Sequence, residues 1–256
     1  MSVFSAEYTS LEANRNIVVR VLFPDSPFDL EQCDTAPKTM YLLHGGGGSS
    51  GDWLRFTSLE FYARKYNFHI VMADAGGSSF YSDMAYGGNY LKFFGEELPA
   101  FVNARFRLPQ DTFICGQSMG GYGCLKVGLN YPERYKAIGC LSGGVSIDSI
   151  VARFSSEQNQ KTMKAIFGDP VTIKDSDRIE YLARRAVSSG KALKIFGVCG
   201  TEDFLYEDNV KFYSYLKEIG YDSEVVFDRG THMWDFWDRQ MPKLMERLCA
   251  YNREQR

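Results

Sequence analysis

The feature that most constrains this chain is a Gly-x-Ser-x-Gly run at residues 116–120, placed between a strand-like and a helix-like segment. The apolar stretch 111–115 precedes the run, and residues 122–130 follow it with helical character before Pro132. Strand, glycine-flanked serine and helix form the context in which this motif builds a sharp nucleophile turn. Glycine is needed at positions 116 and 120 because larger side chains would collide across so tight a bend.

Such a turn holds the Ser118 hydroxyl at the carboxyl end of a strand, above a helix N-terminus with its partial positive charge. The alternative is a glycine-rich loop that only reverses the chain, because a lone motif of this kind is common by chance. The flanking strand and helix favour Ser118 as a nucleophile. Since a serine hydroxyl is a weak nucleophile, a base should lie elsewhere in the chain.

Length and composition favour one folded domain. A chain of 256 residues with 45% hydrophobic residues can bury a substantial core, so we predict a single domain over residues 1–256. The net charge of −3 comes without a basic stripe, which gives no indication of nucleic-acid binding. No apolar run approaches the roughly 20 residues that cross a bilayer, so no membrane association is expected.

The cysteines and the first residues bear on the compartment. Residues 1–10 show neither the charged nor the apolar region of a secretory signal. Cys115, Cys140 and Cys199 lie in apolar strand-like runs and are expected to be reduced, buried thiols. The absence of a CxxC pair argues against a zinc site, and these features together predict a cytoplasmic protein. The remaining cysteines are Cys33, Cys124 and Cys249.

Strand-like and helix-like segments alternate along most of the chain. Strands are expected at 3–10, 16–24, 38–43, 68–73, 111–115, 135–142, 194–199 and 223–228. Helices are expected at 52–66, 89–106, 122–130, 207–219 and 233–251. Within 89–106, Pro99 either kinks the helix or begins a new segment. This alternation predicts an α/β fold with a mostly parallel central sheet and helices on both faces.

Two regions depart from the alternation. No helix separates the first two strands, so they are expected to form an antiparallel N-terminal edge. Residues 143–190 contain three short helical pieces between two predicted strands. We predict that this segment is an insertion, which forms a small helical cap over the carboxyl edge of the sheet.

The three histidines differ in their position relative to that edge. His44 ends a strand and leads into a glycine run, where its expected role is to shape the loop. His69 begins a buried strand and is expected to be structural. His232 follows the last strand and therefore lies at the sheet edge that carries Ser118. His232 is the predicted general base, the alternative being a histidine that only caps the last helix.

A catalytic histidine needs a carboxylate that orients the ring and stabilises the imidazolium. Asp203 follows the strand at 194–199 and lies at the same predicted edge. The order Ser118, Asp203, His232 is the chain order of α/β-hydrolases. Three nearby carboxylates are alternatives that could equally be solvated or cap a helix: Glu202, Glu207 and Asp208.

Residues 44–48 supply a further part of the expected site. Attack on an ester carbonyl creates an oxyanion, which backbone N–H groups can stabilise. Met119, directly after the nucleophile, should provide one donor, and Gly46 the second, with Gly45 as the alternative. A phosphate-binding loop is disfavoured because no Gly-Lys-Ser/Thr follows the glycines.

Aromatic residues gather around the predicted mouth of the site. Trp53 comes shortly after the glycine loop and Trp234 comes two residues after His232, so both are predicted to bind substrate. Any single aromatic residue of this group could equally belong to the ordinary core. The others are Phe80, Tyr81, Tyr86, Tyr90 and Trp237.

The chain resembles the esterase D-like branch of the α/β-hydrolases, and is most similar to small bacterial tributyrin, acetyl and feruloyl esterases. The likeness covers nearly the whole chain and rests on residues 42–46, 116–121, 200–205 and 230–237. It implies hydrolysis of short-chain carboxylic esters without a cofactor, with a small-molecule ester as the partner. The same likeness supports the roles given to Ser118 as nucleophile, Asp203 as acid and His232 as base.

The sequence differs from the family pattern at two places. Four glycines at 45–48 replace a more varied loop, and Asp238 stands where an arginine is frequent. Alternatives with the same catalytic groups are a hydrolase of S-formylglutathione or another thioester, a carbohydrate acetyl or feruloyl esterase, and an acyltransferase. A binding module without catalysis is the alternative of a different class. The natural ester and the oligomeric state stay open.

Overall fold

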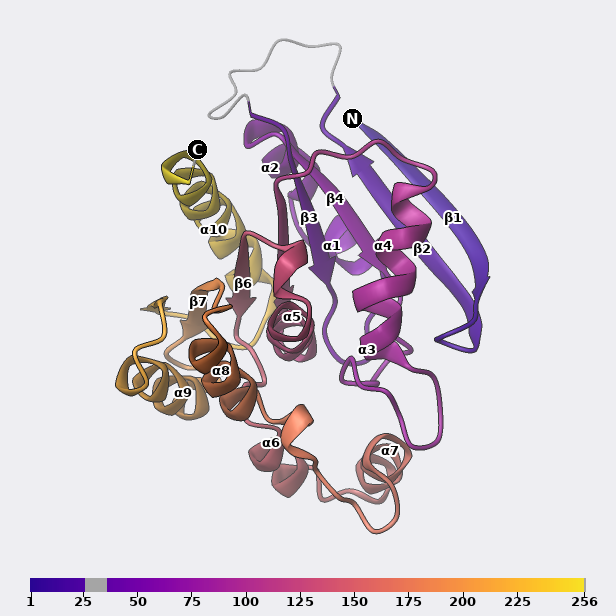
Figure 1. The fold of residues 1–256 in the computed structure, drawn as a ribbon, viewed down its shortest axis with the longest axis vertical. Coiled ribbons are helices and arrows are strands. Elements are labelled where there is room, and N and C mark those ends of the chain that lie inside the picture. The colour runs from indigo at the N-terminus through magenta and orange to yellow at the C-terminus, as the bar shows by residue number, and fades with distance from the viewer. Residues whose placement is uncertain (26–35, 256) are drawn as a thin grey trace.

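A computed structural model of the chain describes residues 1–25 and 36–255. Within these residues, eight strands form one sheet in the order β1-β2-β4-β3-β5-β6-β7-β8 (Figure 1). Most of the segment between the predicted strands at 16–24 and 38–43, including Cys33, lies outside the described residues. The strands are β1 (Ser2–Ser10), β2 (Arg15–Phe23), β3 (Lys38–Leu43), β4 (Phe68–Ala73), β5 (Thr112–Gln117), β6 (Ala137–Leu141), β7 (Lys194–Gly200) and β8 (Ser223–Asp228).

The sheet is mostly parallel with an antiparallel N-terminal edge, as predicted. β1 pairs antiparallel with β2, and β2 pairs antiparallel with β4. The six strands from β4 to β8 in spatial order run parallel to one another. Parallel strands require crossover connections, and the connecting segments supply helices that cover the two faces.

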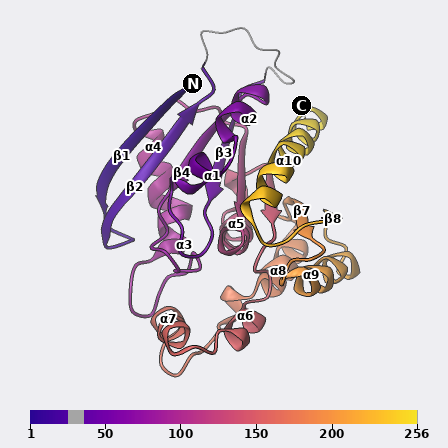
Figure 2. The same ribbon diagram turned by 180° about the vertical axis from the view of Figure 1, so that it is seen from behind.

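Helices cover both faces of the sheet, and each face has its own apolar core. One face carries α3 (Tyr90–Lys92), the π-helical turn η1 (Phe93–Glu97), α4 (Leu98–Asn103), α5 (Met119–Asn130), α8 (Ile179–Ser189) and α9 (Tyr206–Glu218). The other face carries α1 (Asp52–Phe56), α2 (Leu59–Lys65) and α10 (Trp234–Glu254). Figure 2 shows the molecule from this side. Among the described residues, no helix is both long and apolar enough to cross a membrane.

One predicted helix is broken in the structure, and another contains an irregular turn. The segment 52–66 divides into α1 and α2 because Thr57 is extended, and the Asp238 carboxylate accepts the Ser58 N–H at 2.8 Å at the start of α2. The segment 89–106 contains a π-helical turn and ends as a helix at Asn103. Pro99 lies in the first turn of α4, where its missing N–H is tolerated.

The segment 143–190 occupies two different places. Its helices α6 (Ile147–Arg153) and α7 (Glu157–Phe167) lie beyond the ends to which the parallel strands point (Figure 1). A short 3₁₀ turn, η3 (Asp175–Asp177), then leads into α8, which packs beside α5 and α9 on the face of the sheet. Only α6 and α7 are therefore positioned as a cap, and the capping role stays a prediction.

Candidate active site

Ser118 lies at the turn between β5 and α5, and its backbone is in an unusual conformation. Its φ of 57° and ψ of −120° are rare for a residue with a side chain. A Cβ on Gly116 would lie 2.3 Å from the Gly120 carbonyl oxygen, and a Cβ on Gly120 would lie 2.4 Å from the Leu43 carbonyl oxygen. A side chain at either position would therefore collide with backbone, as predicted from the motif, because β3, β5 and α5 converge here.

Neighbouring backbone holds this turn in place. The Ser118 N–H donates to the Leu141 carbonyl at 3.0 Å, which ties the turn to the end of β6. The Ser118 carbonyl accepts the N–H groups of Tyr122 and Gly144, each at 3.1 Å. A serine in a sparsely populated conformation can persist because these bonds over-determine its position.

The structure brings Ser118, His232 and Asp203 into one hydrogen-bonded chain. His232 Nε2 lies 2.8 Å from Ser118 Oγ, and His232 Nδ1 lies 2.8 Å from Asp203 Oδ2. The other oxygen of Asp203 accepts the Leu205 N–H at 2.8 Å, and the Asp203 side chain is fully buried. A carboxylate facing Nδ1 selects the tautomer in which Nε2 is unprotonated, so Nε2 can accept the serine proton.

The rival carboxylates have other partners. Asp208 forms an ion pair with Arg153 of α6 at 2.9 Å and also accepts from Ser149. Glu202 faces Arg229 at 3.5 Å, and Glu207 is exposed at the start of α9. Asp203 is thus the carboxylate that contacts His232.

The glycine loop presents a backbone N–H near the nucleophile. The Gly45 carbonyl oxygen accepts from His44 Nδ1 at 2.8 Å and from the Gly48 N–H at 3.2 Å. In a trans peptide the N–H points opposite to the carbonyl, so the Gly46 N–H points away from these donors. A Cβ on Gly46 would lie 3.9 Å from Met119 Cβ, so the two residues that carry the predicted donors are neighbours in space. Met119 begins α5, so its N–H has no intrahelical partner.

His44 lies behind this loop and is buried. Its Nε2 accepts the Ala75 N–H at 2.9 Å while Nδ1 donates to Gly45. Burial lowers the pKa of the His44 imidazole, and the charges of Asp74 and Asp52 oppose that shift without reversing it. A neutral ring with one defined tautomer therefore holds the glycine loop, in agreement with the role expected for His44.

A cavity of about 210 Å³ opens beside Ser118 and His232. None of the described residues of 143–190 lines it, so this segment does not shape the cavity directly. No role was predicted for Gln117, which occupies a variable position of the Gly-x-Ser-x-Gly run, or for Asp52, which belongs to no motif. The lining consists of Gly45, Gly46, Gly47, Gly48, Asp52, Gln117, Ser118, His232, Trp234 and Trp237.

The aromatic residues occupy two layers at this cavity. Trp234 lines it, whereas Trp53 is buried behind Trp234 with the ring centroids 5.2 Å apart and the planes at 89°. Trp53 Nε1 donates to the Leu43 carbonyl at 3.2 Å, so the prediction that Trp53 walls the pocket is wrong in this structure. Trp237, one helical turn after Trp234, meets the His232 ring edge-on at 4.9 Å.

A larger hollow of about 370 Å³ lies at the opposite edge of the sheet, where β3 and β5 begin. Tyr41, Tyr135 and Arg134 are among its lining residues, and none of the three histidines is. This larger hollow lacks a nucleophile–base pair. The smaller cavity beside Ser118 is therefore the candidate active site.

The chain is similar to known esterases and serine hydrolases. Residues 10–248 match the family described as Putative esterase. An acetyl esterase of Caldicellulosiruptor saccharolyticus is 30% identical over 260 residues, covering 96% of this chain and 97% of that protein. FphF, a fluorophosphonate-binding serine hydrolase of Staphylococcus aureus, has a TM-score of 0.86 at 27% identity, covering 97% of this chain and 98% of that chain. FrmB, an S-formylglutathione hydrolase of the same organism, has a TM-score of 0.83 at 26% identity with the same coverage of both chains.

Proposed function

Because the chain belongs to the Putative esterase family of α/β-hydrolases, and is thus a serine hydrolase for carboxylic esters, we propose that it cleaves short-chain acyl esters through an acyl-enzyme. The proposed roles are Ser118 as nucleophile, His232 as base and Asp203 as the acid that orients it. The observation that carries the proposal is the pair of 2.8 Å contacts that His232 makes with the other two residues, beside a small cavity.

In the first half-reaction Ser118 Oγ attacks the ester carbonyl carbon while His232 Nε2 accepts the hydroxyl proton. Negative charge develops on the carbonyl oxygen, and the N–H groups of Met119 and Gly46 would donate to it. Each such donor typically contributes about 10²–10³ in rate. The buried carboxylate of Asp203 stabilises the imidazolium that forms, and collapse of the intermediate expels the alcohol, which takes the proton from His232.

In the second half-reaction water replaces the alcohol. His232 accepts a proton from the water as its oxygen attacks the acyl carbon, and a second tetrahedral intermediate forms in the same oxyanion site. The C–Oγ bond then breaks, the proton returns from His232 to Ser118, and the carboxylic acid leaves. The cycle needs no group beyond the residues of the site and water.

The size of the cavity supports a short acyl chain. Sites for drug-sized ligands usually measure about 300–1,000 Å³, and this one measures about 210 Å³. The aromatic walls formed by Trp234 and Trp237 offer apolar contact to a few carbon atoms. An acetyl esterase among the relatives supports the same substrate class.

The test is turnover of p-nitrophenyl acetate, butyrate and octanoate, together with mass-spectrometric mapping of a fluorophosphonate adduct. We expect kcat/KM to be highest for the two shorter esters and the adduct to lie on Ser118. Ser118→Ala should lose at least about 10⁴-fold in kcat, since the nucleophile is removed while the fold is kept. An adduct on another residue, or unchanged activity of the variant, would refute the assignment.

Thioester hydrolysis is the second candidate, favoured by the likeness to the S-formylglutathione hydrolase FrmB. An oxygen ester and a thioester with the same acyl group separate the two candidates when their kcat/KM values are compared. A preference for S-formylglutathione over an oxygen formyl ester by more than about tenfold, or about 1.4 kcal/mol, would favour the second.

A further inference from the structure

Tyr81 makes a buried contact with the glycine loop that the proposed reaction does not use. It lies in the long loop between β4 and α3, and its side chain is completely buried. Its hydroxyl donates to the His44 carbonyl oxygen at 2.8 Å. A neutral hydroxyl–carbonyl bond in such a buried place is strongly oriented, because neither group has water as an alternative partner.

The orientation of the His44 carbonyl affects the neighbouring peptide of the glycine loop. It belongs to the peptide directly before the Gly45–Gly46 peptide, whose N–H is the proposed second oxyanion donor. It also lies against α5, since a Cβ on Gly120 would be 2.7 Å from it. A rotation of the His44 carbonyl would therefore change the direction of the Gly46 N–H relative to Met119.

The ring of Tyr81 is wedged against the helix that follows the nucleophile. A Cβ on Gly123 of α5 would lie 2.3 Å from the Tyr81 ring, so only glycine admits the ring at this depth. On another side Phe94 contacts the ring edge-on, with centroids 4.8 Å apart. Tyr81 thus spans the space between α5, which begins with Met119, and the loop that contains Gly46.

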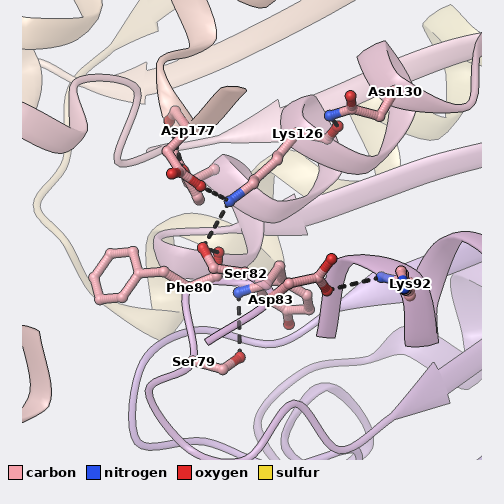
Figure 3. A network of polar contacts seen from close by, with 10 residues as sticks. Ser79, Phe80, Ser82, Asp83, Lys92, Lys126, Asn130 and Asp177 are labelled. Atoms are coloured by element: carbon pink, nitrogen blue, oxygen red, sulfur yellow. Dashed lines mark hydrogen bonds and ion pairs between the residues drawn. The ribbon is translucent and has the colours of Figure 1, made fainter. Parts of the chain in front are cut away.

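A buried lysine on the same helix anchors the residue next to Tyr81. Lys126 Nζ donates to Ser82 Oγ at 2.6 Å and contacts Asp177 Oδ1 at 2.5 Å (Figure 3). The Lys126 side chain is 1% exposed. Ser82 Oγ in turn donates to the Phe80 carbonyl at 3.0 Å. A buried ammonium is tolerated when oxygen acceptors surround it, so the loop is held where Lys126 places it.

This anchor stabilises a backbone that would otherwise be unfavourable. Phe80 and Tyr81 have φ values of 49° and 48°, so two successive residues with side chains are in the left-handed region. Such a conformation is unfavourable for a residue with a side chain, and it persists only where surrounding contacts enforce it. The conformation directs the Tyr81 ring inward, toward His44 and Gly123.

From these contacts we infer that Tyr81 is a positioning residue, which keeps the Gly45–Gly46 peptide aligned with Met119 so that both N–H groups meet the same oxyanion. The inference rests on the proposed ester hydrolysis. Lys126 and Ser82 support it by holding the loop that carries Tyr81. The two proposed oxyanion donors come from different segments, Met119 from α5 and Gly46 from the glycine loop. The Tyr81 side chain contacts both segments.

The test compares Tyr81→Phe with Tyr221→Phe. Tyr221 is also buried and donates to a backbone carbonyl at 2.8 Å, that of Leu193, far from the site. Each variant loses one equivalent hydrogen bond, so a purely structural role predicts similar losses of Tm and no change in kcat. We expect kcat for p-nitrophenyl butyrate to fall about tenfold in Tyr81→Phe only, with KM within about twofold, because the oxyanion contact strengthens in the transition state.

A transition-state analogue provides a second readout. Ki for an alkyl boronic acid, whose adduct with Ser118 carries a charged oxygen, should rise in Tyr81→Phe by about the factor by which kcat/KM falls. Ser82→Ala leaves the phenol in place but removes its anchor, and should give the same pattern with a smaller loss. This variant decides the question if Tyr81→Phe does not fold.

The outcomes separate the inference from the proposed function. A wild-type enzyme without turnover of any ester would overturn the proposed function. An active wild type whose kcat is retained in Tyr81→Phe, or lost equally in Tyr221→Phe, would overturn the positioning role alone. A change confined to KM would do the same, since it would show that ground-state binding was affected instead.

Discussion

His232 Nε2 and Ser118 Oγ lie 2.8 Å apart although 114 residues separate them in the chain. Ser118 follows β5 and His232 follows β8, and both strands end at the same edge of the parallel sheet. Asp203 follows β7, which lies between those strands in the sheet order. The three groups proposed as catalytic therefore meet because parallel strands bring their carboxyl ends to the same edge of the sheet.

Asp203→Asn should lower kcat by about 10⁴-fold near pH 7, because an amide no longer stabilises the imidazolium and can favour the wrong tautomer of His232. Asp208→Asn is the matched control, since Asp208 is also buried but pairs with Arg153 instead of the histidine. The control should keep kcat within about threefold. Steady-state kinetics of both variants on p-nitrophenyl acetate check this, and equal losses would contradict the assignment.

Gly120→Ala should destabilise the fold, because the new Cβ would lie 2.4 Å from the Leu43 carbonyl oxygen and 2.7 Å from that of His44. Backbone at the end of β3 cannot move aside freely, so a loss of about 1–3 kcal/mol is expected. Gly46→Ala is the stability control, since its Cβ would meet only ordinary contact at 3.9 Å from Met119. Urea unfolding measures both variants, and a stable Gly120→Ala protein would show that the turn adapts.

Acid should destabilise the protein through His44. Burial lowers the pKa of the folded-state imidazole below its usual 6.5. The unfolded chain therefore takes up a proton first as the pH falls, so stability is present above about pH 6.5 and is lost below it, by up to about 1.4 kcal/mol per pH unit. Half-buried His69, whose pKa is also lowered by burial, adds in the same direction.

The free energy of unfolding at pH 7 and pH 5 measures this effect. His44→Gln cannot titrate, so its stability should decline less between the two pH values than that of the wild type. Parallel declines in the two proteins would show that other groups, and not His44, cause the acid sensitivity.

Trp234→Ala should shift the acyl preference toward longer chains. Trp234 lines the cavity, so its truncation adds space beside Ser118. We expect the octanoate-to-butyrate ratio of kcat/KM to rise by about tenfold, as a few buried methylenes contribute about 0.8 kcal/mol each. Trp53→Phe is the control, because Trp53 is buried behind Trp234. It should lower stability and leave the ratio unchanged, and an equal shift in both variants would contradict the layered arrangement.

The local parts of the site could be predicted because their signals are local. Residues 116–120 predict the nucleophile turn, since the steric need for Gly116 and Gly120 arises within a few residues. Residues 44–48 likewise predict a backbone loop open to substrate. The alternation of strands and helices places Ser118, Asp203 and His232 each after a strand. It also predicted the mostly parallel sheet that the structure confirms.

Other features could not be predicted because they depend on contacts between distant segments. Trp53 and Trp234 have similar positions relative to their motifs, yet one is buried in the second layer and the other lines the cavity. Which of them faces the cavity depends on how α1 packs against α10. The break between α1 and α2 has a similar origin, since the carboxylate that accepts the Ser58 N–H comes from Asp238.

The sequence by itself determined the alternation of strands and helices, the glycine-flanked Ser118 and the position of His232 after the last strand, because spacing and side-chain size act along the chain. Only the tertiary structure decided that Asp203, and not Asp208, contacts His232, and that Tyr81 reaches the His44 carbonyl. These choices rest on distances of a few ångström between residues remote in sequence. They depend on side-chain packing, which no local pattern encodes.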